Sequence, residues 1–464
     1  MWVGIGFSTV ALAEGLLSVD KYLEEVRQFH QGYQGGKLTE QSSKLRKNEA
    51  YLAYKPAFFT SFQGISDSRI GVFTGINGRN TNTLDFSTGF SWLMEEGLQT
   101  KLSYRLLSTT LTNPNPQLIS FNSYYDGNLV LDMSFPLWRN AGGLETKLQS
   151  ESVLASYEAT SYGSTFKNKQ ILLEAEQAYW RLVLAKEILS ISEQGILRAK
   201  KICDWANRRA TLGLGEQSDC IQARAFLEVR KLDAQLATDE LNSATRYFNA
   251  SRGIVSDQVP SNLMAFSEFK KIGEEALKRQ GQREDVKAAY EQLKIAKNAI
   301  RLASEKLKPS LDLFSTVALN RFDNSLGGAI SNGFNTDTPT YLAGIRYTQP
   351  LYGGVGDAVQ KGLEKEEEAA KLIYEQKKFE QERDWNDLVH RFVDCQKKYD
   401  IAKKIEALQS EKWAIESARH SQGRSTVYQV LMFEQDFASA QMNRIRVEAE
   451  RLTILSQMKL YRSQ

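Results

Sequence analysis

The chain carries two kinds of hydrophobic pattern in succession. Over about 57–136, apolar residues recur at every second position, as at Leu129, Leu131 and Met133, and this spacing predicts β-strands. From Gly143 to Leu212 the spacing changes to steps of three and four, which predicts one helix of about 70 residues, roughly 105 Å long at 1.5 Å per residue.

The same order of patterns occurs a second time. Strands are predicted over about 310–350, followed by a helical pattern that breaks at Gln422-Gly423-Arg424, much as the first breaks at Leu212-Gly213-Leu214-Gly215. The corresponding features also have closely similar spacing in the two halves. A repeat this long is not a solenoid unit, so the pattern indicates an internally duplicated chain with two similar lobes.

This pattern predicts the organisation of the whole chain. We expect an N-terminal segment (1–13), a first repeat (14–253), a linker (254–281) and a second repeat (282–464). The first repeat has short helices over Leu16–Gln31 and Thr39–Leu52, strands over about 57–136 and a helical hairpin over 143–253. The second repeat has a helix, strands over about 310–350 and a helical hairpin over 354–464.

The long helices carry the spacing of a coiled coil. Small alanines at several of these positions allow a neighbouring helix to approach closely. The seam residues are Ile171, Ala175, Ala178, Leu182, Ala185 and Leu189, and Ala225, Val229, Leu232 and Leu236 keep the same spacing on the returning helix. The sequence therefore predicts a long antiparallel helical hairpin in each repeat.

The N-terminal segment resembles a signal peptide. Met1 to Ala13 are uncharged and mostly apolar, and they end in Ala11-Leu12-Ala13, the small-x-small pattern that signal peptidase cleaves. We expect the mature protein to begin at Glu14. A positive n-region is missing, so a start upstream of Met1 and an apolar tail are the alternatives. No later stretch has the roughly 18 apolar residues of a transmembrane helix.

Charge and chemistry exclude several classes of function. The 59 Lys and Arg balance 56 Asp and Glu without a strongly basic stretch, which disfavours a nucleic-acid partner. The chain has no catalytic, cofactor-binding or metal-binding constellation, and we do not expect an enzyme. Cys203, Cys220 and Cys395 lack metal-site spacing and are predicted to be buried thiols.

Several motifs resemble the TolC family of outer-membrane export channels, also called outer-membrane factors. The most specific are the first helical break, which continues as Glu216-Gln217-Ser218-Asp219, and the strand exit Pro350-Leu351-Tyr352-Gly353-Gly354. Pro136-Leu137-Trp138-Arg139-Asn140 and residues 282–289 are further matches. The resemblance runs from about Glu14 to the C-terminus.

The resemblance implies an α+β membrane protein. In the family, three copies share one β-barrel in the outer membrane, with four strands from each, continued by a long α-helical coiled-coil barrel in the periplasm. Here the first strand block is longer than the second. The surplus contains a hairpin near 83–112, with its turn at Met94-Glu95-Glu96-Gly97. It either lies outside the barrel, which we favour, or enters it and gives an eighteen-stranded trimer.

The implied function is that of a passive conduit. The partners would be two further copies of the chain, a periplasmic adaptor, an inner-membrane pump and outer-membrane lipid. Small-molecule efflux is favoured, with type I protein secretion as the alternative. A non-transporting coiled-coil scaffold or adhesin is the alternative from another class. The sequence does not identify the cargo, the pump or the adaptor.

The resemblance also assigns candidate residues. At the tips the glycines act as helix caps, as adaptor-docking points, or as both. The expected pore aperture lacks the family's two aspartates and has Gln429 and Met432 in their place, with Asp436 on the same helix face. Asp219 and His420 are expected to meet between hairpins, and a carboxylate there would raise the histidine pKa; a solvated His420 is the alternative. The candidate docking residues are Leu212, Gly213, Leu214, Gly215, Gln422, Gly423, Arg424 and Ser425.

Overall fold

The computed structural model describes residues 17–70, 74–78, 80–258, 263, 266, 279, 281–334 and 336–461. The predicted signal segment 1–13 lies outside these residues, as does most of the linker 254–281. The chain divides into two compact units. We call them the helical unit (Met1–Gln41, Ser161–Lys287 and Gln376–Gln464) and the sheet unit (Ser42–Thr160 and Ala288–Glu375).

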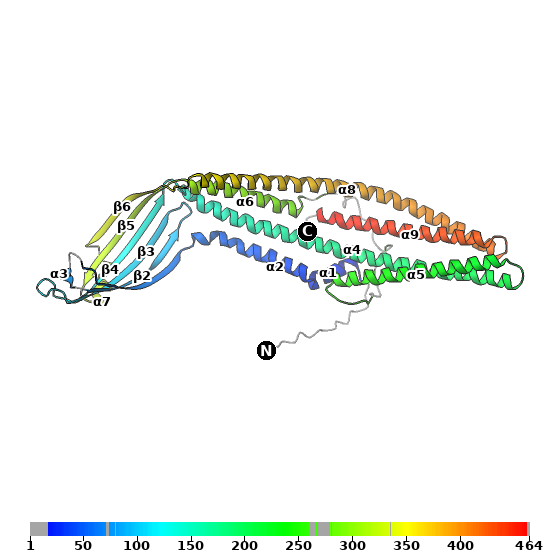
Figure 1. Cartoon of the computed structure of the whole chain (residues 1–464), viewed down its shortest axis with the longest axis horizontal. Coiled ribbons are helices and arrows are strands. Elements are labelled where there is room, and N and C mark those ends of the chain that lie inside the picture. Colours follow the sequence, from blue (N-terminus) through cyan, green and yellow to red (C-terminus); the bar gives the residue numbers. More distant parts are fainter. Residues whose placement is uncertain are drawn as a thin grey trace, which may run out of the picture. The chain divides into compact units, whose positions relative to one another are not determined.

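Two helices of 68 residues each dominate the chain, α4 (Leu144–Thr211) and α8 (Gly354–Ser421). Each is followed by a returning helix, as the spacing of apolar residues predicts (Figure 1). The remaining helices of the described residues are α1 (Val19–Phe29), α2 (Gln31–Arg46), α3 (Thr74–Asn77), α5 (Gln217–Ser251), α6 (Glu284–Leu307), α7 (Leu326–Asn332) and α9 (Val427–Met458), with 3-10 turns at Lys47–Tyr54, Ala141–Gly143 and Lys459–Tyr461.

The predicted bounds of the second short helix, Thr39–Leu52, are wrong, although its residues are helical, in α2 and in the 3-10 turn Lys47–Tyr54. Helix α2 instead begins at Gln31, runs through Gly32, Gly35 and Gly36, and ends at Arg46. A Cβ atom at Gly36 would lie 2.1 Å from Oδ1 of Asn168, and the hydroxyl of Ser164 donates a hydrogen bond to the Gly36 carbonyl at 2.6 Å. Gly36 therefore serves the close approach of α2 to α4 rather than ending a helix.

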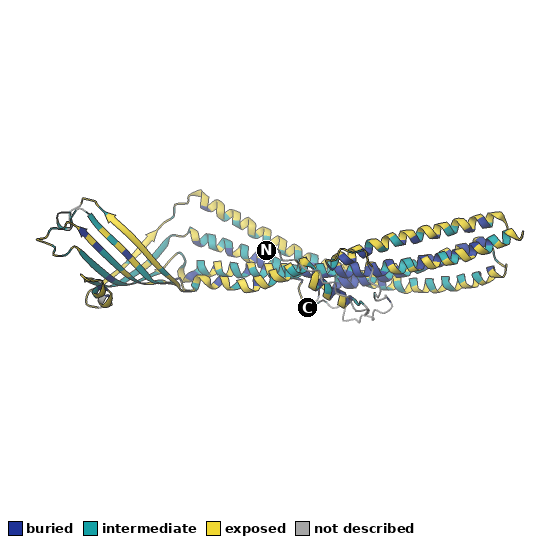
Figure 2. Cartoon of the chain, turned by 90° about the horizontal axis from the view of Figure 1, so that it is seen from below, coloured by how far each residue is buried: buried dark blue, intermediate teal, exposed yellow. Residues whose placement is uncertain are grey.

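The helical unit has a large hydrophobic core. Tyr22 of α1 stacks on Phe248 of α5, with ring centroids 4.3 Å apart, and its hydroxyl donates to the Phe248 carbonyl at 3.2 Å. Four residues of the predicted seam on α4 are buried in this unit: Ala175, Ala178, Leu182 and Ala185. Figure 2 shows the buried residues gathered here, while the outer faces of the helices are exposed.

The sheet unit contains one antiparallel sheet of six strands in sequential order, β1-β2-β3-β4-β5-β6. The sheet thus has six strands, where the resemblance implies four from each chain, and the hairpin near 83–112 is part of it. That hairpin supplies β2 and β3, with Gly97 at φ 88° in their turn. The strands are β1 (Ala57–Asp67), β2 (Asn80–Leu93), β3 (Gln99–Thr112), β4 (Ser123–Pro136), β5 (Ser310–Asp323) and β6 (Pro339–Thr348).

The strand register gives the sheet one apolar and one polar face. Residues that pair across strands point to the same face, so the pairing fixes the composition of both faces. The apolar face carries Phe58, Phe62, Phe86, Phe90, Trp92, Leu102, Leu106, Leu129, Leu131, Leu313, Val317, Leu319, Tyr341, Ile345 and Tyr347. The polar face carries Ser61, Gln63, Asp85, Ser87, Lys101, Ser103, Arg105, Asp126, Asn128, Asp132, Thr316, Asn320 and Arg346.

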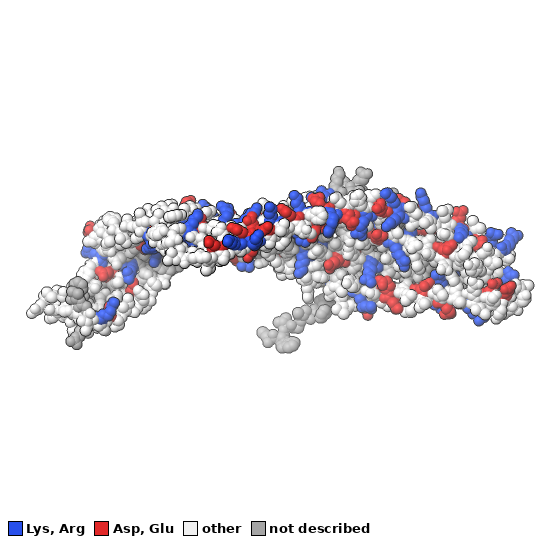
Figure 3. Space-filling model, turned by 45° about the horizontal axis from the view of Figure 1, so that its top comes forward, with Lys and Arg blue, Asp and Glu red and all other residues white. Residues whose placement is uncertain are grey.

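Charged side chains are distributed unevenly. Lys, Arg, Asp and Glu are mixed along the helices and are sparser over the sheet (Figure 3). Within the described residues, no helix offers an apolar stretch long enough to span a membrane.

Candidate functional site at the helical hairpin tips

The first tip joins α4 to α5 through a glycine-capped turn. Gly213 has φ 70°, a conformation that glycine adopts without strain. The Leu214 amide donates to the Arg209 carbonyl at 2.9 Å and closes the last turn of α4. Leu212 and Leu214 are 71% and 65% exposed. The tip thus presents two leucines to solvent on a compact turn.

The second tip repeats this geometry between α8 and α9. Gly423 has φ 74°, and the Arg424 amide donates to the Arg419 carbonyl at 2.9 Å. Thr426 caps α9, its hydroxyl accepting from the Gln429 amide at 3.3 Å. Gly213 and Gly423 thus have the backbone angles predicted for capping glycines, whereas Gly215, the third predicted cap, does not have a positive φ.

A surface cavity of about 380 Å³ lies between the two tips. The Arg209 guanidinium lies over the Trp205 ring, 4.8 Å from its centroid, and donates to the Leu214 carbonyl at 2.8 Å. Arg209 also approaches the second tip, because a Cβ atom at Gly423 would lie 3.3 Å from its Nη1. The lining residues are Trp205, Ala206, Arg209, Leu214, Gly215, Glu216, Asp219, Gly423, Ser425, Thr426 and Val427.

His420 lies beside this cavity and is buried, at 5% exposure, rather than solvated. Its ring packs on Trp205 with centroids 3.8 Å apart. Burial and the positive charge of Arg209 lower the His420 pKa, and the carboxylates of Asp219 and Glu416 oppose this without reversing it. The expected rise in pKa is therefore wrong, because desolvation outweighs the carboxylates.

The candidate aperture residues lie on α9 close to the second tip. Gln429 and Met432 are exposed in the single chain. Asp436, one turn further along, forms an ion pair with Lys412 of α8 at 3.2 Å. The Lys412 ammonium also lies 3.7 Å from the centroid of the Phe433 ring. The nearest acidic group of the predicted aperture thus has a cation beside it, which the sequence did not reveal.

A buried cluster of charges behind the tips was missed from the sequence. Glu434 of α9 is fully buried, and its two carboxylate oxygens accept from Arg198 of α4 at 3.0 Å and from Arg230 of α5 at 2.9 Å. The three residues are far apart in the chain, so no local motif could have shown their pairing. The cluster fixes three helices relative to one another.

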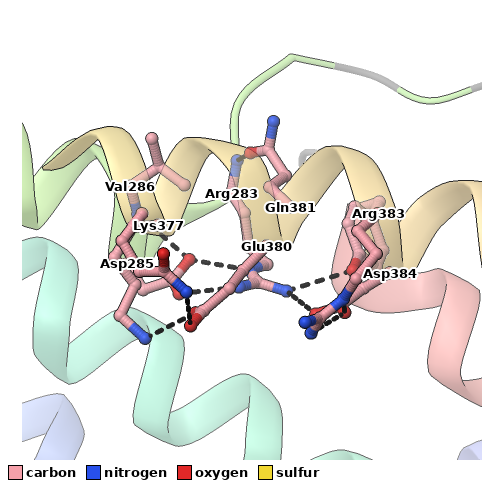
Figure 4. Close-up of polar contacts among 10 residues, drawn as sticks. Arg283, Asp285, Val286, Lys377, Glu380, Gln381, Arg383 and Asp384 are labelled. Atoms are coloured by element: carbon pink, nitrogen blue, oxygen red, sulfur yellow. Dashed lines mark hydrogen bonds and ion pairs between the residues drawn. The ribbon is translucent and has the colours of Figure 1, made fainter. Parts of the chain in front are cut away.

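A second polar cluster surrounds Arg283, within the matched stretch 282–289 (Figure 4). Its Nε donates to Asp285 at 2.7 Å, its Nη1 donates to the Tyr461 hydroxyl at 3.0 Å, and its amide donates to the Gln381 side chain at 2.6 Å. Burial lowers the Arg283 pKa, but the hydrogen bond and charge of Asp285 outweigh it, so the pKa lies above its ordinary value. This arginine connects the start of α6 with α8 and the C-terminal turn.

The three cysteines are buried and unpaired, as predicted. Burial raises the pKa of Cys203 and Cys395. Among the described residues, no cluster of His, Cys, Asp and Glu could hold a metal ion.

Comparison with solved structures reveals the same fold in several outer-membrane channels. The chain matches OprN with a TM-score of 0.66 and 15% identity, covering 96% of this chain and 89% of that one. It matches the open state of Neisseria gonorrhoeae MtrE with a TM-score of 0.66 and 16% identity, over 96% and 88% of the two chains. This chain has an outer-membrane channel fold.

Other comparisons are consistent with this channel fold. Campylobacter jejuni CmeC, also an outer-membrane channel, matches with a TM-score of 0.63 and 15% identity, covering 96% of this chain and 85% of that one. No protein-family model and no curated protein sequence matches the chain. The likeness therefore lies in the fold rather than in the sequence, as identities near 15% indicate.

Proposed function

We propose that this chain is an outer-membrane factor of the TolC family. Three copies form a passive channel through the bacterial outer membrane, and their helices continue the conduit into the periplasm. An inner-membrane pump delivers substrates to it through a periplasmic adaptor, and small molecules are the favoured cargo. The observation that carries the proposal is the six-stranded sheet, which is apolar on one face and polar on the other.

A sheet of this kind suits a barrel wall formed by several copies. A transmembrane barrel directs apolar residues to lipid and polar residues to its interior. In the described chain β1 and β6 each pair with one neighbour only. Unpaired strand edges are not tolerated in lipid, so further copies are needed to close the wall.

Exposed apolar stripes on the helices also call for partner copies. Val229, Leu232 and Leu236 of α5 have the spacing of a helix-packing seam, yet they are 52%, 59% and 58% exposed. A similar exposed stripe on α8 consists of Ile401, Ile405, Leu408 and Ile415. We assign these stripes to contacts between copies, because stripes of this spacing favour packing against another helix.

The two tips are the proposed docking points for the adaptor. They present exposed Leu212 and Leu214, small turn residues and the cavity that contains Arg209. A helical hairpin of another chain can approach the glycine backbone closely at such a place. Capping and docking are compatible, since the cap uses the backbone and docking uses the outer surface.

Cell fractionation and native mass spectrometry test the proposal. We expect a mature protein that begins at Glu14, fractionates with the outer membrane and forms a detergent-stable trimer. Affinity purification after cross-linking in cells should recover an adaptor and a pump. A soluble monomer that retains Met1 would contradict the proposal.

A further inference from the structure

The β2–β3 hairpin is an integral part of the sheet. β2 pairs with β1 from Thr81 to Ser91, and β3 pairs with β4 from Gln99 to Thr110. β1 and β4 are not neighbours, so the sheet is continuous only through β2 and β3. If β2 and β3 lay outside the barrel, no strands would connect β1 to β4 in the barrel wall.

One row of residues shows that the apolar face continues across every strand. Each residue pairs with the next, and the row includes both strands of the hairpin in question. It reads Phe58, Phe90, Leu102, Leu131, Val317 and Tyr341. The hairpin therefore has the same lipid-facing side as β4 and β5.

The opposite face of the hairpin holds an ion pair. Asp85 of β2 accepts hydrogen bonds from Nε of Arg105 on β3 at 3.0 Å and from Gln63 of β1 at 2.9 Å. The Asp85 side chain is only 7% exposed. Placing a charge at the centre of a bilayer is energetically costly. This face therefore belongs in a water-filled interior rather than in lipid.

We propose that the barrel has eighteen strands, six from each of three copies, with β1 of one copy pairing to β6 of the next. This inference rests on the proposed trimeric channel. The two edge strands suit the pairing because β1 has 11 residues and β6 has 10. A transmembrane strand needs about 9–11 residues. Further copies of the same chain can supply hydrogen-bonding partners for both edge strands and so close the ring.

The strand number determines the width of the channel in the membrane. With strands about 4.8 Å apart and tilted by about 40°, eighteen strands give a backbone diameter of about 35 Å, against about 24 Å for twelve. The cross-section roughly doubles, and barrels of 16–18 strands enclose an aqueous channel. The membrane section would therefore admit cargo wider than four strands per copy allow.

Cysteine accessibility in the assembled protein tests whether the hairpin lines the barrel. The variants are Lys101→Cys and Leu102→Cys on β3, with Asp132→Cys and Leu131→Cys as matched positions on β4, because Lys101 pairs with Asp132 and Leu102 with Leu131. The chain without these changes measures the background from the three buried cysteines. Trimers in liposomes are treated with a water-soluble maleimide, and a bimane label at each site is exposed to a lipid-phase quencher.

We expect residues 101 and 132 to react with the maleimide about tenfold faster than residues 102 and 131, and only the latter pair to be quenched from lipid, as an alternating barrel wall requires. If β4 alternates while both β3 cysteines lack this pattern, the hairpin lies outside the barrel and the eighteen-strand proposal fails alone. If neither strand alternates, the sheet is not in the membrane, and the proposed function fails with it. Native mass spectrometry counts the copies, and any number other than three overturns the count of eighteen.

Discussion

Glu434 of α9 and Arg230 of α5 form a buried ion pair, in which one carboxylate oxygen accepts from Nε at 3.1 Å and from Nη2 at 2.9 Å. The other carboxylate oxygen accepts from Arg198 of α4. Both arginines are nearly buried, and Arg230 has a second carboxylate beside it, that of Asp233, at 3.0 Å. The glutamate thus holds α4, α5 and α9 together behind the tips.

Replacing Glu434 with Ala should destabilise the helical unit by about 3–5 kcal/mol, because the buried Arg198 loses its carboxylate partner and Arg230 keeps only the ion pair with Asp233. Glu434→Gln keeps an acceptor oxygen and should cost less. The measurement is thermal unfolding followed by circular dichroism. Glu228→Ala serves as the control, since Glu228 pairs with Lys231 on the surface, where such pairs contribute about 0–1 kcal/mol. Equal losses in the Ala variants at 434 and 228 would contradict this account.

The tip should lose stability on acidification because of His420. Its pKa is lowered in the folded chain, so the unfolded chain binds the proton more readily. The stabilisation is fully present above the ordinary histidine pKa of about 6.5 and is lost as pH falls below it toward the folded value. Denaturant unfolding between pH 7.5 and 4.5 measures this.

His420→Phe is the matched variant, because phenylalanine fits beside Trp205 and cannot bind a proton. Its unfolding free energy should change less over the same pH range. The difference between the two curves isolates the contribution of the histidine. Identical curves would show that His420 does not account for the acid sensitivity.

Gly213→Trp and Gly423→Trp should leave trimers intact but abolish dye export, because a bulky side chain blocks close approach of the adaptor. Gly213→Asn is the control for capping, since asparagine tolerates a positive φ at small cost. No heavy atom lies within 4 Å of a Cβ at Gly213, so this variant meets no clash. Adaptor cross-linking and ethidium accumulation in a complemented deletion strain provide the measurements. Full export by both Trp variants would show that these glycines act as helix caps and not in adaptor docking.

Divalent cations should block the closed channel only through Asp436. Because the Lys412 ammonium pairs with Asp436, Lys412→Met should strengthen the block, whereas Asp436→Asn should remove it. Replacing Gln429 and Met432 with Ala should raise the conductance, because these side chains narrow the pore by packing and dewetting. Single-channel recordings in lipid bilayers with and without magnesium test both effects. The aperture lies elsewhere if none of these variants changes the block or the conductance.

The sequence predicted those elements whose signals are local. The helix from Gly143 to Leu212 differs from the observed α4 by one residue at each end, because its apolar spacing and the following glycine are both local features. The strand count was wrong because pairing of β1 with β2 depends on partners that periodicity does not identify. Gly36 was read as a helix end because its contact with Asn168 is distant in sequence.

In the candidate site, too, only the features with local signals could be predicted from the sequence. The positive φ of Gly213 and Gly423 follows from their position after a long helical pattern. The pKa of His420 depends on burial against Trp205 and on Arg209, and neither neighbour could be inferred from the residues around position 420. The Glu434 cluster likewise joins three separate helices.

The topology of the sheet also dictates an order of assembly. In four of the five strand pairs, the two strands are separated in sequence only by a short connection. In the fifth pair, β4 and β5 are separated by α4, α5 and α6, so this pair cannot form until these helices and β5 have followed. Contacts this distant in sequence form slowly, because a long loop must first close. Until then β1 to β4 form a meander whose fourth strand is an open template for mispairing. The chain should therefore depend on chaperones during this interval, and the completion of the β4–β5 pair marks its end.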